Sequence, residues 1–150
     1  MKKILLKNAN LVLENKIEKA TVLICEDKIE KIFSKDLDLS EIVYDDLIDL
    51  EGKYLGPAFV DVHVHGADGA DAMDIDEEAL RKVSKYLAKE GTANFLVTTL
   101  TSTKDELKRV LEITAKLQNK DIDGANIFGV HMEGPYFAVE YKGAQNEKYI

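Results

Sequence analysis

The feature that most constrains the fold is a regular alternation of strand-like and helix-like segments after residue 57. Apolar, β-branched runs end near positions 65, 99 and 133, so successive ends lie 34 residues apart. Each gap holds a segment with the apolar periodicity of an amphipathic helix. Strands that alternate with helices pair in parallel through right-handed crossovers. The spacing therefore predicts an α/β fold, and its evenness favours a (β/α) barrel over an irregular open sheet.

The two helix-like segments carry recognisable start and stop signals. The first follows the acidic run 74–77 and ends before Gly91, a residue typical of the position just after a helix. The second begins at Thr103, and Glu106 three residues later completes the pattern of a capping box. The strands expected around these helices cover residues 58–65, 92–100 and 126–133.

Residues 1–56 have a different character. Short β segments separated by turn-forming residues are expected at 4–6, 11–13, 20–25, 28–33 and 47–50. We expect a turn at 8–10 between the first two segments, and a hairpin tip at Glu26 and Asp27. This part of the chain is predicted to be a small antiparallel β unit, and Pro57 marks its boundary with residues 57–150.

Composition and charge exclude several classes of function. The 150-residue chain has a formal net charge of −8, which argues against nucleic acid and anionic membranes as partners. Its single cysteine, Cys25, cannot form an intrachain disulfide and lies in an apolar run typical of a buried thiol. No apolar stretch approaches the ~18 residues of a membrane span. We therefore expect a cytoplasmic protein that binds neither nucleic acid nor membrane.

Two of the three histidines occupy alternate positions at the end of the first expected strand. His63 and His65 leave the same face of that strand, about 6.6 Å apart along the backbone. A lone strand histidine is usually a hydrogen-bonded core or edge residue. A same-face pair before Gly66 favours metal ligation instead, because imidazole is the commonest metal ligand.

Glu133 ends the third expected strand, so parallel pairing would place it on the same rim as the two histidines. Two imidazoles and a carboxylate suit a hydrolytic Zn²⁺ or Fe²⁺ site, where the metal lowers the pKa of bound water toward ~7. His131 shares the face of Glu133 and is interpreted as a substrate contact or a support for a ligand. Asp61 could orient an imidazole N–H or act as a structural acceptor. β propensity and helix capping suffice to explain the Thr/Ser cluster at 98–102.

Two segments resemble known motifs. Pro57–Gly66 resembles the first-strand motif of the amidohydrolase superfamily, which many of its members share. The run 131–136 followed by 142–145, together with Gly91-Thr92 and 98–102, resembles N-acetylglucosamine-6-phosphate deacetylases much more specifically, and the resemblance covers essentially the whole chain. Dihydroorotase-like and deaminase-like relatives commonly carry a bridging lysine instead of this glutamate, which argues against them.

The resemblance implies a TIM (β/α)₈ barrel, with the first three βα units in residues 57–150 and part of a small β-sandwich in residues 1–56. It implies a hydrolase that releases acetate from N-acetylglucosamine 6-phosphate, a small-molecule amino-sugar phosphate, with one or two divalent ions, Zn or Fe. The residues that match metal ligands are His63, His65 and Glu133. Ala144 matches a residue that contacts the sugar.

The chain departs from the family pattern in two ways. Ala58 stands where the family usually has glycine, and a complete barrel needs roughly 250 residues. We therefore expect an N-terminal fragment, inactive alone, whose general-base aspartate and further histidine ligands would lie beyond Ile150. Unpaired barrel strands predict a homo-oligomer. Two alternatives stay open, another amidohydrolase and a non-catalytic truncated module.

Overall fold

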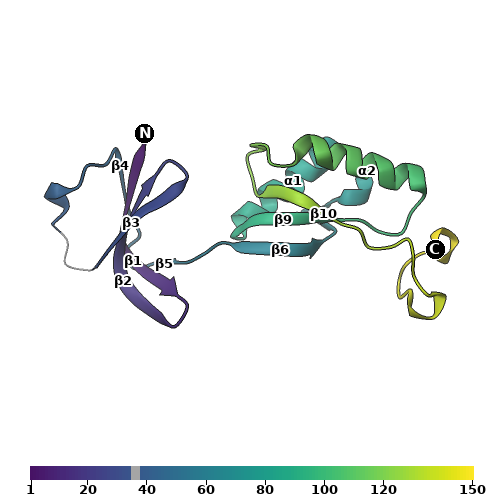
Figure 1. Cartoon of the computed structure of the whole chain (residues 1–150), viewed down its shortest axis with the longest axis horizontal. Helices are drawn as coiled ribbons and strands as arrows, with labels where there is room; N and C mark the ends of the chain where they lie inside the picture. Colours follow the sequence, from purple (N-terminus) through teal and green to yellow (C-terminus); the bar gives the residue numbers. More distant parts are fainter. Residues whose placement is uncertain (35–37) are drawn as a thin grey trace. The chain divides into compact units, whose positions relative to one another are not determined.

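The computed structural model describes residues 1–34 and 38–150, which form two compact units, Met1–Pro57 and Ala58–Ile150. The first unit consists of β strands and a single short 3₁₀ turn among its described residues, whereas the second combines strands with two α-helices (Figure 1). The observed fold class is α/β, as the strand–helix alternation predicted.

The first unit is built on one five-stranded sheet. Its order is β3-β2-β1-β4, with β5 also beside β1. Cys25 pairs with Lys28 at the end of the β2–β3 hairpin, which confirms the predicted tip at Glu26 and Asp27. The elements are β1 (Lys3–Leu13), β2 (Lys16–Cys25), β3 (Lys28–Ser34), η1 (Leu39–Glu41), β4 (Asp46–Asp49) and β5 (Tyr54–Leu55).

Two expectations for this unit were wrong. Residues 8–10 do not form a turn, because β1 runs through them with a bulge between Leu6 and Ala9, where Asn8 has a φ of 57°. The sheet is also mixed rather than antiparallel, because β4 and β5 both pair with β1 in parallel. The Asp45 N–H donates to the Lys3 carbonyl and sets the start of β4 beside the start of β1. Alternation within one strand does not encode the direction of its partner.

The carboxylate of Asp49 closes the turn after β4. Its Oδ1 accepts from the Glu51 backbone N–H at 2.9 Å and from Asn8 Nδ2 at 2.8 Å, and Lys7 Nζ lies 3.0 Å from Oδ2. These contacts, the Glu51 N–H foremost, lower the pKa of Asp49 from 3.8 to about 2.

The lowered pKa of Asp49 predicts a pH-dependent contribution to stability. A carboxylate with a depressed folded-state pKa stabilises the fold fully above its unfolded value, here 3.8, and loses that effect as the pH falls through about 2. We expect Asp49→Asn to lower the melting temperature above pH 4 and to have little effect at pH 2. Calorimetry of both proteins across this range tests it, and equal destabilisation at both ends would contradict it.

The second unit contains a parallel three-stranded sheet of order β10-β9-β6. The strands end earlier than expected, so His131 closes β10 and Glu133 lies two residues beyond it. A short β7–β8 hairpin after β6 was not predicted. The elements are β6 (Phe59–Val64), β7 (Gly66–Ala67), β8 (Ala70–Asp71), η2 (Ala72–Asp74), α1 (Glu77–Lys89), β9 (Thr92–Thr98), α2 (Lys104–Leu117), β10 (Asn126–His131), η3 (Val139–Tyr141) and η4 (Glu147–Tyr149).

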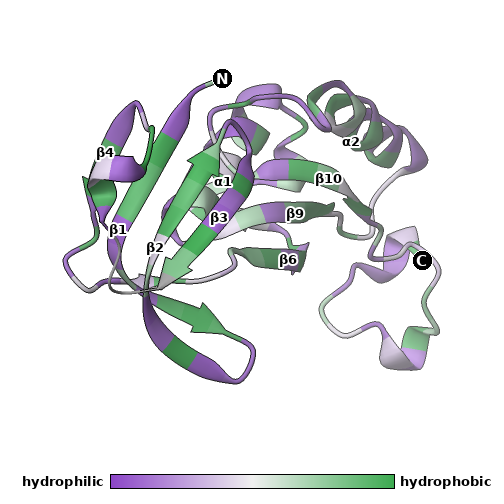
Figure 2. Ribbon diagram, turned by 60° about the vertical axis from the view of Figure 1, so that its left-hand side comes forward, coloured by the Kyte–Doolittle hydropathy of each residue, from purple (hydrophilic) through white to green (hydrophobic). Residues whose placement is uncertain are grey.

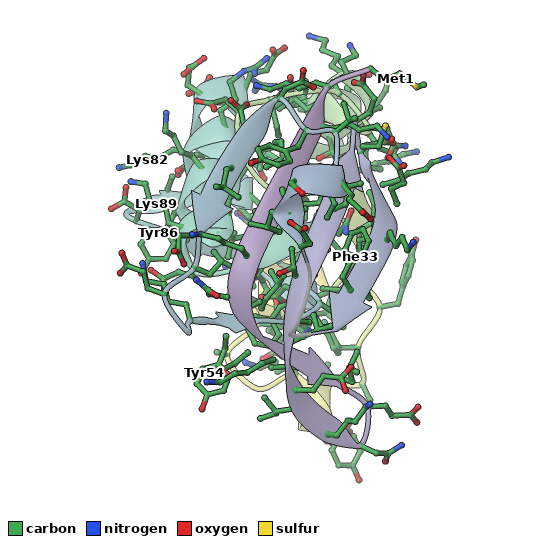
Figure 3. All side chains as sticks on the ribbon, turned by 90° about the vertical axis from the view of Figure 1, so that its left-hand side faces the viewer. Met1, Phe33, Tyr54, Lys82, Tyr86 and Lys89 are labelled. Carbon is green, nitrogen blue, oxygen red and sulfur yellow. The ribbon has the colours of Figure 1, made fainter. Side chains whose placement is uncertain are left out.

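Both long helices lie on the same face of this sheet (Figure 1). They cover a core that includes Phe95 and Val97 of β9 together with Val83 and Val110 of the helices. Hydrophobic residues accordingly concentrate in the strands, while the turns are mostly hydrophilic (Figure 2). On the outer side of α1, Lys82, Tyr86 and Lys89 extend away from the ribbon (Figure 3).

The ends of the helices follow the sequence signals in most respects. Thr103 and Glu106 form the expected capping box of α2, and Gly91 follows α1 with a φ of 88°. Asp76 is the N-cap of α1 but makes no side-chain bond, while the capping box formed by Asp71 and Asp74 belongs to η2. In the described part of the chain, no helix combines the length and the hydropathy that a membrane crossing needs.

Candidate metal centre

The two histidines lie at the carboxyl end of β6. His63 is the next-to-last residue of the strand, and His65 follows it directly. Val64, between them, packs against the core under the helices, so the neighbouring side chains point to the opposite face of the sheet. The Nε2 atoms of the two rings lie 3.3 Å apart. The alternate spacing of His63 and His65 along the chain therefore brings their Nε2 atoms close together.

Glu133 joins the two histidines at this rim. Its Oε2 lies 2.9 Å from His63 Nε2 and 3.2 Å from His65 Nε2. The three side chains are partly open to solvent, with exposed fractions of 47%, 33% and 25% for His63, His65 and Glu133. The end of β6, with His63 and His65, and the residues after β10, with Glu133, thus lie together, as the parallel pairing of β6, β9 and β10 predicts.

The geometry of the three groups fits a divalent metal ion. Their nearest ligand atoms are separated by 2.9 to 3.3 Å. Ligands of a tetrahedral zinc ion at ~2.0–2.1 Å lie about 3.3 Å from one another, so a small opening of the trio accommodates the ion. Two imidazoles and a carboxylate are donors that suit zinc or iron. Among the described residues this is the one group of His, Cys, Asp and Glu with such proximity.

His131 lies beside this group but contributes no atom to it. Its ring centroid is 4.5 Å from that of His63, and its Nδ1 lies 3.0 Å from the Val62 carbonyl oxygen. Since a carbonyl only accepts, Nδ1 carries the proton and donates to Val62. In the neutral ring this leaves Nε2 as an acceptor. The expected substrate contact of His131 stays a prediction.

The sequence predicts a supporting role for Asp61 and a contact with the sugar for Ala144. Asp61 Oδ1 accepts from the backbone N–H of His63 at 3.0 Å, so it contacts the peptide of that residue rather than its ring. The Nδ1 of His65 is buried and has no hydrogen-bond partner in the described part of the chain. Ala144 is exposed in the loop between η3 and η4. Its contact with a sugar stays a prediction.

Thr98 holds β6 in place next to the histidines, a role that sequence reasoning missed. The β6–β9 ladder is interrupted between Asp61 and Val64. There the fully buried Thr98 hydroxyl accepts from the Val64 N–H at 3.0 Å and donates to the Leu96 carbonyl at 3.3 Å. β propensity alone therefore does not account for this threonine. The sequence signal for this role was the presence of a polar residue within a buried strand.

Replacing Thr98 by valine is expected to destabilise the second unit by about 1–3 kcal/mol, because the near-isosteric side chain leaves the Val64 N–H without a partner. Thr114→Val is the matched control, since the buried Thr114 hydroxyl has no hydrogen-bond partner among the described residues. That control is expected to be neutral or stabilising. Urea denaturation of both variants measures the difference, and equal effects would contradict the assignment.

A glycine beside Glu133 is required by the space around it. Gly134 has a φ of 83°, and a Cβ at this position would lie 2.4 Å from Thr101 Oγ1 and 2.9 Å from Phe137 Cε2. Any other residue would have to displace these side chains as well as adopt a strained backbone conformation. The backbone that presents Glu133 is therefore fixed by local packing.

Known proteins resemble this chain along most of its length, although no protein-family model matches it. The N-acetylglucosamine-6-phosphate deacetylase of Vibrio furnissii is 39% identical over 99 residues, which cover 66% of this chain and 25% of that protein. The N-acetylgalactosamine-6-phosphate deacetylase of Escherichia coli O157:H7 is 36% identical over 94 residues, which cover 63% and 25%. The chain thus spans about a quarter of the length of these relatives.

The fold agrees with that of the same group of proteins. The crystal structure of N-acetylglucosamine-6-phosphate deacetylase from Pasteurella multocida matches with a TM-score of 0.84 and 26% identity, over 98% of this chain and 38% of that one. Sequence and structure therefore point to the same group of relatives. On both grounds, the chain is similar to part of the N-acetylglucosamine-6-phosphate deacetylases.

Proposed function

We propose that this chain supplies part of a metal-dependent active site that deacetylates N-acetylglucosamine 6-phosphate, giving glucosamine 6-phosphate and acetate. The observation that carries the proposal is the approach of His63, His65 and Glu133 to within 3.3 Å of one another. This group lies at the carboxyl ends of parallel strands, where barrel enzymes build their active sites. The names of the relatives supply the class of substrate.

The three residues would hold a divalent ion, zinc or iron. When bound, such an ion acts as a Lewis acid toward the acetamide carbonyl and activates water. The chain's own residues keep the ligand atoms in place: Asp61 fixes the His63 peptide, and Thr98 fixes the Val64 peptide. The acceptor Nε2 of His131 and the small side chain of Ala144 are proposed to face the sugar.

The fold proposed for the intact enzyme is a TIM barrel of which residues 57–150 form the first three βα units. The parallel order β10-β9-β6 and the 34-residue spacing support it. Residues 1–56 are proposed as part of a β-sandwich. Within the described residues β6 and β10 are the edges of their sheet, which supports the proposed self-association. Sedimentation analysis tests the oligomeric state.

Acetate release tests the proposed reaction. In a chimera, residues 1–150 replace the matching segment of the Pasteurella multocida deacetylase, and N-acetylglucosamine 6-phosphate is supplied with Zn²⁺ or Fe²⁺. We expect turnover that a chelator abolishes and that Glu133→Ala removes. A folded chimera that binds metal but releases no acetate would contradict the proposal. N-acetylgalactosamine 6-phosphate serves as the comparison substrate, because one relative is named for it.

The 150 residues alone are expected to show no measurable turnover, even with metal added. The resemblance assigns the general base and further metal ligands to later barrel strands, and the chain spans about a quarter of its relatives. The same acetate assay on the purified chain checks this. Turnover comparable to that of a full-length relative would refute it.

A further inference from the structure

The β7–β8 hairpin begins at the residue directly after His65 and gives the backbone of that histidine a second support. The two strands pair antiparallel, and the next bond beyond their ladder joins the Ala72 N–H to the His65 carbonyl at 2.8 Å. Asp68 and Gly69 form the tip, and their φ values of 52° and 73° are both positive, as in the type I′ turns of two-residue hairpins. His65 therefore lies at the base of a tight hairpin.

The β6–β9 ladder supports His65 less directly. That ladder is interrupted between Asp61 and Val64, and its last pair joins Val64 to Val97, so His65 lies beyond it. The Nδ1 atom of His65 is buried and has no hydrogen-bond partner among the described residues. Because no hydrogen bond at Nδ1 orients the ring, the direction of the side chain depends on the backbone of His65.

The strand that returns from the tip of the hairpin is anchored in the core. Ala72 is 3% exposed and belongs to the cluster that both helices cover. Directly before it, Asp71 forms the capping box of η2 with Asp74. Core packing and this capping box therefore fix the N–H group to which the His65 carbonyl bonds.

Gly66 allows the hairpin to close next to His65. A Cβ at position 66 would overlap the Ala70 carbonyl oxygen and would lie 2.8 Å from Asp71 Cα. Both are backbone atoms, so any other residue would have to push β7 and β8 apart. The φ of Gly66 is not positive, so the lack of space, and not the backbone conformation, requires glycine here.

We propose that the β7–β8 hairpin positions His65 for metal ligation, with Gly66 and Ala72 as the positioning residues. Neither has a side-chain ligand atom, and both act on the backbone that directs His65 Nε2 toward Glu133 Oε2, 3.2 Å away. The inference rests on the proposed function, since the group that His65 would hold is the divalent ion. Residues that orient a metal ligand typically contribute about 10- to 100-fold to metal affinity.

The test compares Co²⁺ binding by the 150-residue chain and its variants. Gly66→Ala forces the hairpin strands apart, and Ala72→Pro removes the N–H that bonds His65. We expect each to raise the Kd for Co²⁺ by about 10- to 100-fold. Proline otherwise suits position 72, because Ala72 begins η2 and the preceding Asp71 is extended, with φ −137° and ψ 152°.

Each variant has a matched control. Gly69→Asn adds a side chain at the hairpin tip, where asparagine tolerates a positive φ and a Cβ meets no atom within 4 Å. Glu77→Pro places proline at the first position of α1, after the extended Asp76. Both controls should leave the Kd unchanged. A folded Gly66→Ala or Ala72→Pro chain with the wild-type Kd would overturn the proposal.

A double-mutant cycle separates positioning from a general loss of stability. In a His65→Ala background, Ala72→Pro should have no further effect on the Kd for Co²⁺, because it acts only through that ring. In a His63→Ala background its effect should persist. Equal effects in the two backgrounds would mean that Ala72 does not act through His65.

A further readout needs no metal. In the chain with ¹⁵N-labelled histidine, Ala72→Pro should shift the ring nitrogens of His65 but not those of His131, and an unchanged His65 ring would overturn the proposal. If neither variant folds, amide exchange in the unaltered chain decides, since the Ala72 N–H should exchange slowly, and exchange as fast as in an unstructured peptide would overturn the proposal. If the unaltered chain takes up no Co²⁺, the proposed function fails, and the ring resonances still decide whether the hairpin positions His65.

Discussion

Replacing Glu133 by alanine is expected to weaken the binding of Zn²⁺ or Co²⁺ by more than about 100-fold. Losing only a hydrogen bond to a metal ligand already lowers metal affinity by about 10- to 100-fold, and this change removes the ligand itself. Glu133 Oε2 is the atom that both imidazoles approach most closely. Without it the site keeps two neutral nitrogens and no negative charge to offset that of the ion. Competition against a chromophoric chelator measures the change in Kd.

The controls separate ligation from general effects on charge. Glu140→Ala removes an exposed carboxylate from the same segment and should leave the Kd unchanged. His63→Ala should weaken binding as Glu133→Ala does, because it removes another member of the same trio. Wild-type affinity in the Glu133→Ala chain would mean that the metal binds elsewhere, and the proposed centre would have to be abandoned.

Phe95→Ala is expected to destabilise the second unit by about 3–5 kcal/mol, because truncating a buried aromatic removes its transfer energy and leaves a cavity. Phe95 is 1% exposed on β9, the middle strand of the three-stranded sheet, and contributes to the core under both helices. A loss of this size is a large part of the stability of a typical domain. Chemical denaturation followed by circular dichroism measures it.

Phe128→Ala provides the comparison on the neighbouring strand. Phe128 belongs to β10 but is 39% exposed, so its truncation removes less apolar surface from the interior. We expect a clearly smaller change in the unfolding free energy than for Phe95→Ala. Similar losses at both positions would show that the core does not lie on the helix side of the sheet.

The sequence predicted those features that depend on local periodicity. Strands and helices of the second unit follow from apolar spacing and capping residues, and the meeting of His63, His65 and Glu133 follows from parallel pairing of equally spaced strands. The parallel pairing of β4 with β1 was not predicted, because the residue pattern of one strand does not determine whether its neighbour runs parallel or antiparallel.

The supporting contacts could not be predicted for a related reason. Thr98 bonds Val64 across 34 residues, and Gln145 bonds Thr101 across 44. Both bonds depend on how closely separate segments approach in three dimensions. A threonine or a glutamine in isolation has many possible partners, so residue type and spacing leave these roles undetermined.

The bond from His131 to the Val62 carbonyl also limits how position 131 can evolve. The His131 ring links the end of β10 to the peptide that precedes His63 in β6. A single hydrogen bond therefore connects the two strands that lead to the candidate ligands. A residue that replaces His131 and keeps this bond must carry a hydrogen-bond donor at the same distance from the backbone, as the amide nitrogen of asparagine does. An aliphatic side chain at position 131 would lose this hydrogen bond and leave His63 on β6 less firmly positioned. The substitution would therefore affect a metal ligand, although residue 131 itself does not contact the ion.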